Sequence, residues 1–130
     1  MKIDNTLRIP VDLEIVWKIE KKLGQPCKLE IKTTGRDMAF DLSSGGIGII
    51  SKHFLPIGLR IQIAFSGRML GLNKYLRLKG EVRYCSSCSK QRNFRCGIKF
   101  INPPESYSAK FKEFRLSFEK RQYPRIRLSD

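Results

Sequence analysis

The sequence is poor in acidic residues. Its 130 residues include 12 Asp and Glu against 26 Lys and Arg, which gives a formal net charge of +14. Such an excess attracts polyanions through long-range electrostatics, so nucleic acid, an anionic membrane surface and phosphorylated small molecules are all compatible partners. Hydrophobic residues make up 41% of the chain, enough for the core of one ordinary domain. The charge alone does not choose among these partners.

The sequence also has few of the residues that enzymes use. His53 is the only histidine, and most carboxylates stand between Lys and Arg residues. The GxSxG, HExxH and Walker-type patterns of hydrolases, metalloproteases and nucleotide phosphatases are missing from the sequence. We therefore expect a protein that is not an enzyme and has no cofactor.

Long apolar runs are lacking as well. No run approaches the roughly 18–20 residues that a membrane-spanning helix needs. Residues 1–8 are polar and mixed in charge, which is unlike a signal peptide. We expect no membrane span and a cytoplasmic location.

Cysteines are few, and their spacing allows two interpretations. Cys85 and Cys88 have CxxC spacing, so a zinc site with Cys96 and Cys27 is one alternative. Disulfides are not expected in a cytoplasmic protein. Cys96 alternates in phase with buried-type residues of its strand, which favours a buried structural thiol. We therefore expect no metal, and we place Cys85 and Cys88 at a hairpin tip.

Alternating apolar and polar residues dominate the first hundred positions. This period of two predicts strands that bury one face, and Gly, Pro, Ser or Asn separates them. Short strands without intervening helices indicate an antiparallel barrel or sandwich. The sequence thus predicts a mainly β fold of six or seven strands, near residues 9–19, 29–31, 38–42, 47–49, 59–65, 76–84 and 94–100.

The pattern changes after Asn102-Pro103-Pro104. Aromatic residues then recur at spacings of four, three and four, which places them on one face of a helix: Tyr107, Phe111, Phe114 and Phe118. We predict a helix over about 104–121, ended by Pro124 no later than about Gln122, and a basic tail over 121–130. The aromatic stripe is expected to cover the barrel, and helix-mediated assembly of a homo-oligomer is the alternative.

A first candidate binding segment joins two of the predicted strands: Asp41-Leu42-Ser43-Ser44-Gly45-Gly46. Its small residues let the backbone approach a ligand closely. The Asp41 carboxylate can accept hydrogen bonds from N1 and N2 of a guanine. Ser43 offers a hydroxyl, and amides of the loop, with Ser44 and Gly45 at its centre, can donate to phosphate. Taken alone, the segment is also typical of an ordinary β-turn with a glycine bulge.

A second candidate segment lies near the C-terminus, where Arg121 and Arg125 flank an aromatic residue and a proline, and Arg127 follows. Guanidinium groups bind phosphate and the O6/N7 edge of guanine in a planar, bidentate way, and they stack on purine faces. Taken alone, this segment is also typical of a basic tail that binds polyanions without selectivity.

Together these segments resemble the PilZ family of receptors for cyclic di-GMP (c-di-GMP). That family has a [D/N]xSxxG motif on its barrel and an RxxxR motif on a flexible segment. Asp41, Ser43 and Gly46 fit the first motif fully, and the runs 41–51, 55–58, 80–82 and 94–100 are similar to the family's later strands. The resemblance implies a single domain over residues 1–130 whose β-barrel, at about 8–101, binds c-di-GMP.

The sequence departs from the family in its arginines. The arginine pair of the family usually precedes the first strand, where Arg8 fits the second arginine but Asp4 stands in place of the first. The only intact RxxxR runs from Arg121 to Arg125. Three possibilities remain open: the tail folds back onto its own barrel, it reaches the barrel of a neighbouring subunit, or this chain is a degenerate member that has lost binding.

The resemblance implies a mechanism and leaves two rivals. c-di-GMP would dock between the Asp41–Gly46 segment and the arginine tail, and ordering of the tail would signal to a downstream protein partner. One rival is a basic barrel that binds nucleic acid, which is less expected because it gives no role to an acid, Asp41, in the ligand loop. The other rival is an adaptor that binds no nucleotide.

Overall fold

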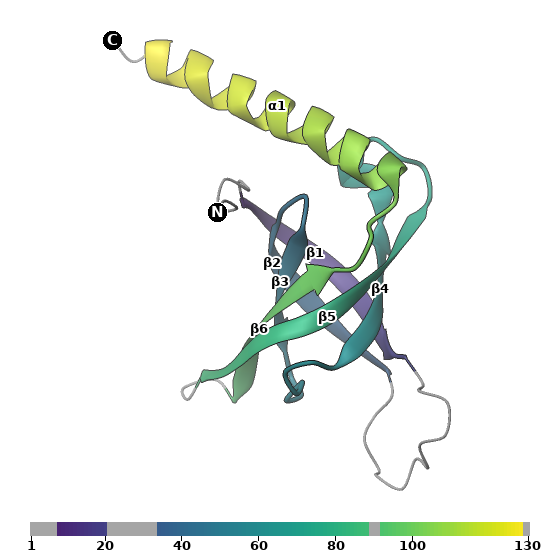
Figure 1. Ribbon diagram of the computed structural model, residues 1–130. Helices are drawn as coiled ribbons and strands as arrows, with labels where there is room; N and C mark the ends of the chain where they lie inside the picture. Colours follow the sequence, from purple (N-terminus) through teal and green to yellow (C-terminus); the bar gives the residue numbers. More distant parts are fainter. Residues whose placement is uncertain (1–7, 21–33, 89–91, 129–130) are drawn as a thin grey trace, which may run out of the picture.

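The computed structural model describes residues 8–20, 34–88 and 92–128, with side chains described as far as residue 119. Within these residues, six antiparallel strands close into a barrel in the order β1-β2-β3-β6-β5-β4 (Figure 1). The predicted mainly β barrel with a C-terminal helix is confirmed, whereas the strand expected near 29–31 lies outside the described residues. The elements are β1 (Ile9–Ile19), β2 (Thr34–Leu42), β3 (Gly46–Ser51), β4 (Arg60–Ser66), the 3-10 turn η2 (Gly67–Leu70), β5 (Tyr75–Cys88), β6 (Asn93–Phe100) and the helix α1 (Glu105–Leu128).

The alternation seen in the sequence fills the inside of the barrel. The first and fourth strands close it, with Ile15 opposite Phe65 and Trp17 opposite Ile63. Because successive side chains of a strand point to opposite faces, every second residue enters the interior. The fully buried core includes Ile15, Trp17, Leu42, Ile47, Ile49, Ile61, Ile63, Phe65 and Val82.

One buried polar pair lies within this core. Trp17 Nε1 donates to the Asp37 carboxylate at 2.6 Å, and the Lys52 amide donates to the same carboxylate at 3.2 Å. Gly35 and Asp37 both lie within β2. A Cβ on Gly35 would collide with the Trp17 ring. The glycine therefore makes room for the indole.

The cysteines follow the prediction only in part. Cys96 is buried, as expected. Cys85 and Cys88 lie on the last part of β5 rather than at a hairpin tip, because pairing with β6 continues as far as Cys88 opposite Asn93. In the described part of the chain, no three His, Cys, Asp or Glu residues gather as a metal ion would require. Cys27 lies outside those residues.

The helix α1 starts where the sequence predicted and packs on one end of the barrel. The Pro104 carbonyl accepts from the amides of Tyr107 and Ser108, which makes Pro104 the cap. Tyr107 and Phe111 are fully buried, and the Tyr107 ring meets the edge of Phe100 with centroids 5.4 Å apart. The first part of the aromatic stripe thus covers the barrel, as predicted.

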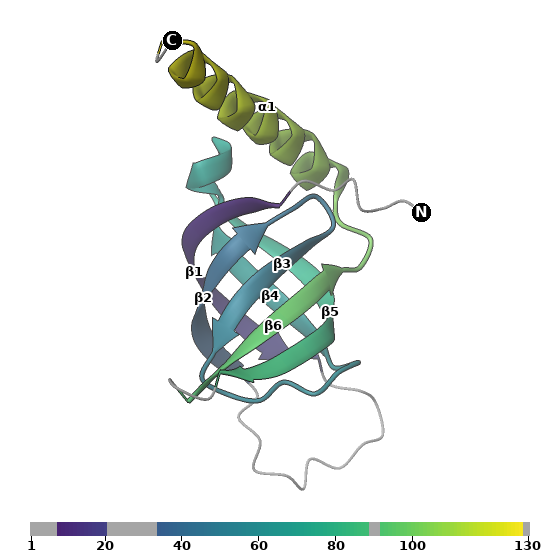
Figure 2. The ribbon, with the colours of Figure 1, turned by 90° about the vertical axis from the view of Figure 1, so that its left-hand side faces the viewer.

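The end of α1 differs from the prediction. The helix continues through Pro124 to Leu128, where an end near Gln122 and a tail were expected. A proline removes one backbone hydrogen bond and crowds the preceding turn, and the residues on both sides of it are helical nonetheless. Both views of the ribbon show α1 leading away from the barrel (Figures 1 and 2). Of the helices in the described residues, none is long and apolar enough to cross a membrane.

Candidate ligand-binding site

A β-bulge in β2 makes the Asp41 side chain face the outside of the barrel. In the pairing of β2 with β3, Ala39 lies opposite Ile49 and Asp41 opposite Gly48, so Phe40 is an extra residue on β2. Ala39 and Leu42 on either side face the core. In an unbroken strand, one of the two residues between them would also point inward; the bulge lets both Phe40 and Asp41 face outward.

Gly48 forms the floor beneath these two side chains. A Cβ on Gly48 would lie 2.6 Å from the Asp41 carboxylate and 2.6 Å from the Phe40 ring. A larger residue at position 48 would therefore push both side chains aside. The absence of a side chain at position 48 lets the Asp41 carboxylate and the Phe40 ring lie close against β3.

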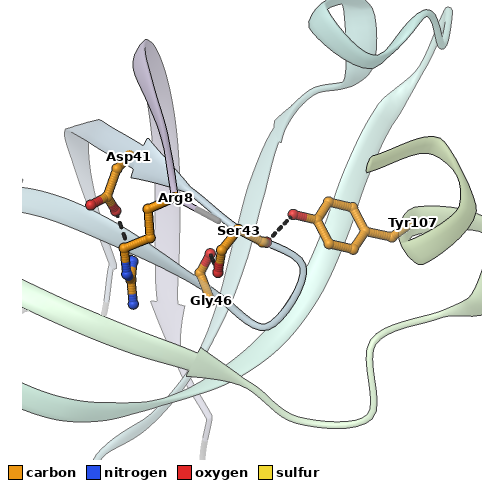
Figure 3. A network of polar contacts seen from close by, with 5 residues as sticks. All are labelled: Arg8, Asp41, Ser43, Gly46 and Tyr107. Atoms are coloured by element: carbon orange, nitrogen blue, oxygen red, sulfur yellow. Dashed lines mark hydrogen bonds and ion pairs between the residues drawn. The ribbon is translucent and has the colours of Figure 1, made fainter. Parts of the chain in front are cut away.

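The structure brings Arg8 and Asp41 together. The Arg8 guanidinium donates to the Asp41 carboxylate at 2.9 Å (Figure 3), and the two side chains are 50% and 20% exposed. Arg8 occupies the position that fits the second arginine of RxxxR, just before β1. The pair stands at the surface, so both partners can exchange this contact for contacts with a ligand.

Ser43 is used inside the turn between β2 and β3. Its amide donates to the Gly46 carbonyl at 2.9 Å, and its hydroxyl donates to the same oxygen at 3.2 Å. The residue is only 2% exposed. The hydroxyl that the sequence offered to a ligand is thus already engaged in closing the turn. Ser44 and Gly45 form the exposed tip.

Gly46 permits the close pairing of β3 with β6. A Cβ on Gly46 would lie 2.5 Å from the Ile98 carbonyl oxygen, which is backbone and has no room to move. The three motif residues therefore have different tasks in this structure. Asp41 faces outward, Ser43 closes the turn, and Gly46 lets the neighbouring strand approach.

Tyr107 ties α1 to the same turn. Its hydroxyl donates to the Ser43 carbonyl at 2.7 Å (Figure 3). Burial raises the pKa of Tyr107, so the phenol keeps its proton and remains a donor. In the sequence, Tyr107 stands out only as a member of the aromatic stripe. Its hydroxyl, which the phenylalanines of the stripe lack, was the signal that it has a polar partner.

Two basic residues that the sequence did not single out lie on the same outer face. Arg95 and Lys99 are exposed on β6 on either side of Gly97, and Gly97 pairs with Gly48. The Arg95 guanidinium lies over the Phe40 ring, 4.3 Å from its centroid. The alternation of β6 already placed Arg95 and Lys99 outward, but only the strand order shows that β6 lies beside the Asp41–Gly46 segment.

The backbone that carries the three C-terminal arginines does not return to this face in the same chain. Arg121, Arg125 and Arg127 lie in the last part of α1, and their side chains lie outside the described residues. The helix leads away from the barrel in both views, so its C-terminal end lies apart from the β2–β3 turn (Figures 1 and 2). A helix in place of the expected tail is the reason, since it fixes the direction in which this part of the backbone leads.

Comparison with known proteins identifies the family. The family model of the PilZ domain matches residues 8–116. The chain belongs to the PilZ family. The match covers the whole barrel, the Asp41–Gly46 segment and the first part of α1, which confirms the resemblance seen in the motifs. No curated protein matches the sequence.

Solved PilZ structures share the fold at low sequence identity. The inhibitor of motility of Bacillus subtilis matches with a TM-score of 0.67 and 14% identity over 93% of this chain and 54% of its own. YcgR of Escherichia coli in complex with c-di-GMP matches with a TM-score of 0.65 and 19% identity over 96% of this chain and 50% of its own. The PilZ chain thus spans about half the length of these two proteins.

A third structure resembles this chain over nearly its full length. A tetrameric PilZ domain of Xanthomonas campestris, which self-assembles through a helical bundle, matches with a TM-score of 0.64 and 13% identity. The match covers 92% of each chain. At these identities the likeness shows the fold alone.

Proposed function

We propose that this chain is a c-di-GMP receptor whose ligand docks on the outer face of the barrel over β2, β3 and β6. The observation that carries the proposal is the outward Asp41 carboxylate beside Arg8, in a family that includes a structure solved with c-di-GMP. Asp41 accepts hydrogen bonds from N1 and N2 of a guanine. Arg8, Arg95 and Lys99 supply positive charge for the phosphates.

An acid at the centre of this basic face favours a guanine nucleotide over other polyanions. A carboxylate repels phosphate, so at a site for phosphate alone Asp41 would reduce affinity. It contributes only when a ligand offers donors, and the Watson–Crick edge of guanine offers two side by side. Because Gly48 has no side chain, the Asp41 carboxylate lies close against β3, and 20% of the Asp41 side chain stays exposed to a ligand.

The C-terminal arginines are proposed to act on the barrel of a second copy. Because α1 leads away from its own barrel, we place Arg121 and Arg125 at the Asp41–Gly46 segment of a neighbouring subunit, with Arg127 near the phosphates. Leu116 is 44% exposed on α1, and the self-assembling relative associates through helices. These features support an oligomer formed by the helix.

Ligand binding would then tie the helix of one subunit to the barrel of another. Tyr107 links the start of α1 to the Ser43 carbonyl, so a change at the turn also reaches the helix. Fixing the helix in this way would present a new surface to a downstream protein partner. This replaces the ordering of a free tail that the sequence suggested, since the segment is helical to Leu128.

Calorimetric titration with three ligands tests the proposal. We expect saturable binding of c-di-GMP and at least about tenfold weaker binding of cyclic di-AMP, which has the same charge but lacks the N1 and N2 donors. A single-stranded oligonucleotide should bind more weakly than c-di-GMP at physiological salt. Equal affinity for the two cyclic dinucleotides would contradict the role of Asp41.

Two outcomes would favour the rival functions. Tight oligonucleotide binding that falls steeply as salt rises would support a nucleic-acid-binding barrel. Failure of every ligand to bind a folded protein would support an adaptor that has lost nucleotide binding.

A further inference from the structure

Two cysteines meet across the strands β5 and β6 on the inner side of the barrel. Cys85 lies directly opposite Cys96, and the Cys96 thiol donates to the Cys85 Sγ at 3.3 Å. Residues directly opposite in an antiparallel pair have Cα atoms about 4.5–5.5 Å apart, which falls within the range of about 4.4–6.8 Å that a disulfide bridges. Rotation of the side chains is therefore sufficient to bond the two sulfurs, without movement of the backbone.

The CxxC spacing itself cannot supply this bond. Cys85 and Cys88 lie on the same strand, three residues apart. A strand rises about 3.3 Å per residue, so their Cα atoms are about 10 Å apart, beyond the limit of about 7 Å for a disulfide. Cys88 pairs with Asn93 instead. The partner of Cys85 is thus the distant Cys96 and not its neighbour in sequence.

We propose that Cys85 and Cys96 are a redox-active thiol pair that a peroxide oxidises to a reversible disulfide across β5 and β6. In the first step the Cys85 sulfur attacks the peroxide, gains an oxygen as sulfenic acid, and water leaves when the oxidant is hydrogen peroxide. In the second step the Cys96 sulfur attacks the Cys85 sulfur, the S–S bond forms, and the hydroxyl leaves as water with the Cys96 proton. Two thiols and one hydrogen peroxide thus give one disulfide and two waters.

The surroundings assign the two steps to different residues. Cys85 is half-buried and reachable from solvent, whereas Cys96 is fully buried. Burial and the hydrogen bond with Cys85 raise the pKa of Cys96, so this thiol stays protonated and does not react with an oxidant in solution. It serves as the resolving thiol, because its contact with Cys85 places it next to the sulfenic acid as soon as that forms.

The bond would fasten the β5–β6 end of the barrel. It closes the chain between positions 85 and 96, which restricts the unfolded state and raises the thermal midpoint by about 5–10 °C. The pair lies on the inner side of β5 and β6, whereas the proposed ligand face lies on the outer side of β2, β3 and β6. The test of the oxidation therefore requires no ligand.

The test uses the full chain with the substitutions Cys27→Ser and Cys88→Ser, so that Cys85 and Cys96 are its only cysteines. After treatment with hydrogen peroxide, alkylation with N-ethylmaleimide and digestion with trypsin, non-reducing mass spectrometry should find the two cysteine peptides joined. The protein should remain a monomer on a non-reducing gel, and dithiothreitol should reverse both the cross-link and the rise in thermal midpoint. Adding Cys85→Ser to this background is the matched control, which should show none of these changes.

Two results would overturn the inference. One is an oxidised protein in which both cysteines still take up maleimide after unfolding. The other is a bond that joins two chains, or that in the wild type joins Cys27 or Cys88 in preference to the Cys85–Cys96 pair.

Discussion

Replacing Asp41 with alanine is expected to weaken c-di-GMP binding about 10- to 100-fold, the loss of one good bidentate contact to a base. The direction of the change is informative because the ligand is anionic. Removal of a nearby negative charge would strengthen binding if Coulomb attraction alone held the ligand. Weaker binding therefore requires that Asp41 accepts hydrogen bonds from the ligand. Calorimetric titration of both proteins with c-di-GMP measures the effect.

A second pair of residues supplies the matched control. Glu14 forms an ion pair with Arg36 at 3.7 Å, and Glu14 lies opposite Met38, farther from the turn than Asp41. Glu14→Ala also removes an exposed acid beside an arginine, but it should leave c-di-GMP affinity unchanged. Tighter binding by the Asp41→Ala variant would show that the face is a simple phosphate site.

Mixing two inactive variants is expected to restore binding if the helix arginines act between subunits. Arg121→Ala/Arg125→Ala removes the proposed donor pair, and Asp41→Ala removes the acceptor. Each variant alone should bind c-di-GMP at least about tenfold more weakly than the wild type. In a mixed dimer, the intact barrel of one chain meets the intact helix of the other, so random exchange in an equal mixture restores about one quarter of the sites. Titration of the mixture after subunit exchange counts them.

The same mixture distinguishes action between subunits from action within one chain. If the helix acted on its own barrel, both variants would fail and the mixture would recover nothing. If the arginine pair had no role, the double variant would bind like the wild type. Arg115→Ala, on the described part of α1, controls for the loss of a helix arginine that lies closer to the barrel.

The sequence predicted the architecture because alternation reports directly on which strand face is buried. The runs at 9–19, 59–65 and 94–100 correspond closely to β1, β4 and β6. The bulge at Phe40 could not be predicted in this way, because a reading with period two does not register an extra residue in one strand. The bulge makes the Asp41 side chain face outward. This orientation therefore becomes visible only in the structure.

The candidate site was predicted in part for the same reason. The motif located the β2–β3 turn and its Asp41, Ser43 and Gly46. It did not reveal that the Ser43 hydroxyl donates to the Gly46 carbonyl within the turn. That contact depends on the path of the backbone. The sequence also did not identify Arg95 and Tyr107 as site residues. Arg95 is near the turn because β6 pairs with β3, and Tyr107 is near it because α1 packs on that end of the barrel.

The end of α1 shows the limit of a rule based on one residue. Pro124 predicted the end of the helix, but the helix continues through it to Leu128. The proline costs one backbone hydrogen bond, but it does not end the helix at this position. Because the segment is helical, the direction of α1 decides where the backbone at positions 121 and 125 lies.

The most direct test of the proposed ligand face is to map the amides that respond to c-di-GMP by two-dimensional ¹H–¹⁵N NMR. We predict that the largest shifts fall on Asp41 to Gly48 and on the β6 amides from Arg95 to Lys99, while the far end of the barrel, around His53 and Cys88, stays unchanged. Shifts confined to that far end, or the lack of any shift at saturating nucleotide, would contradict the proposal.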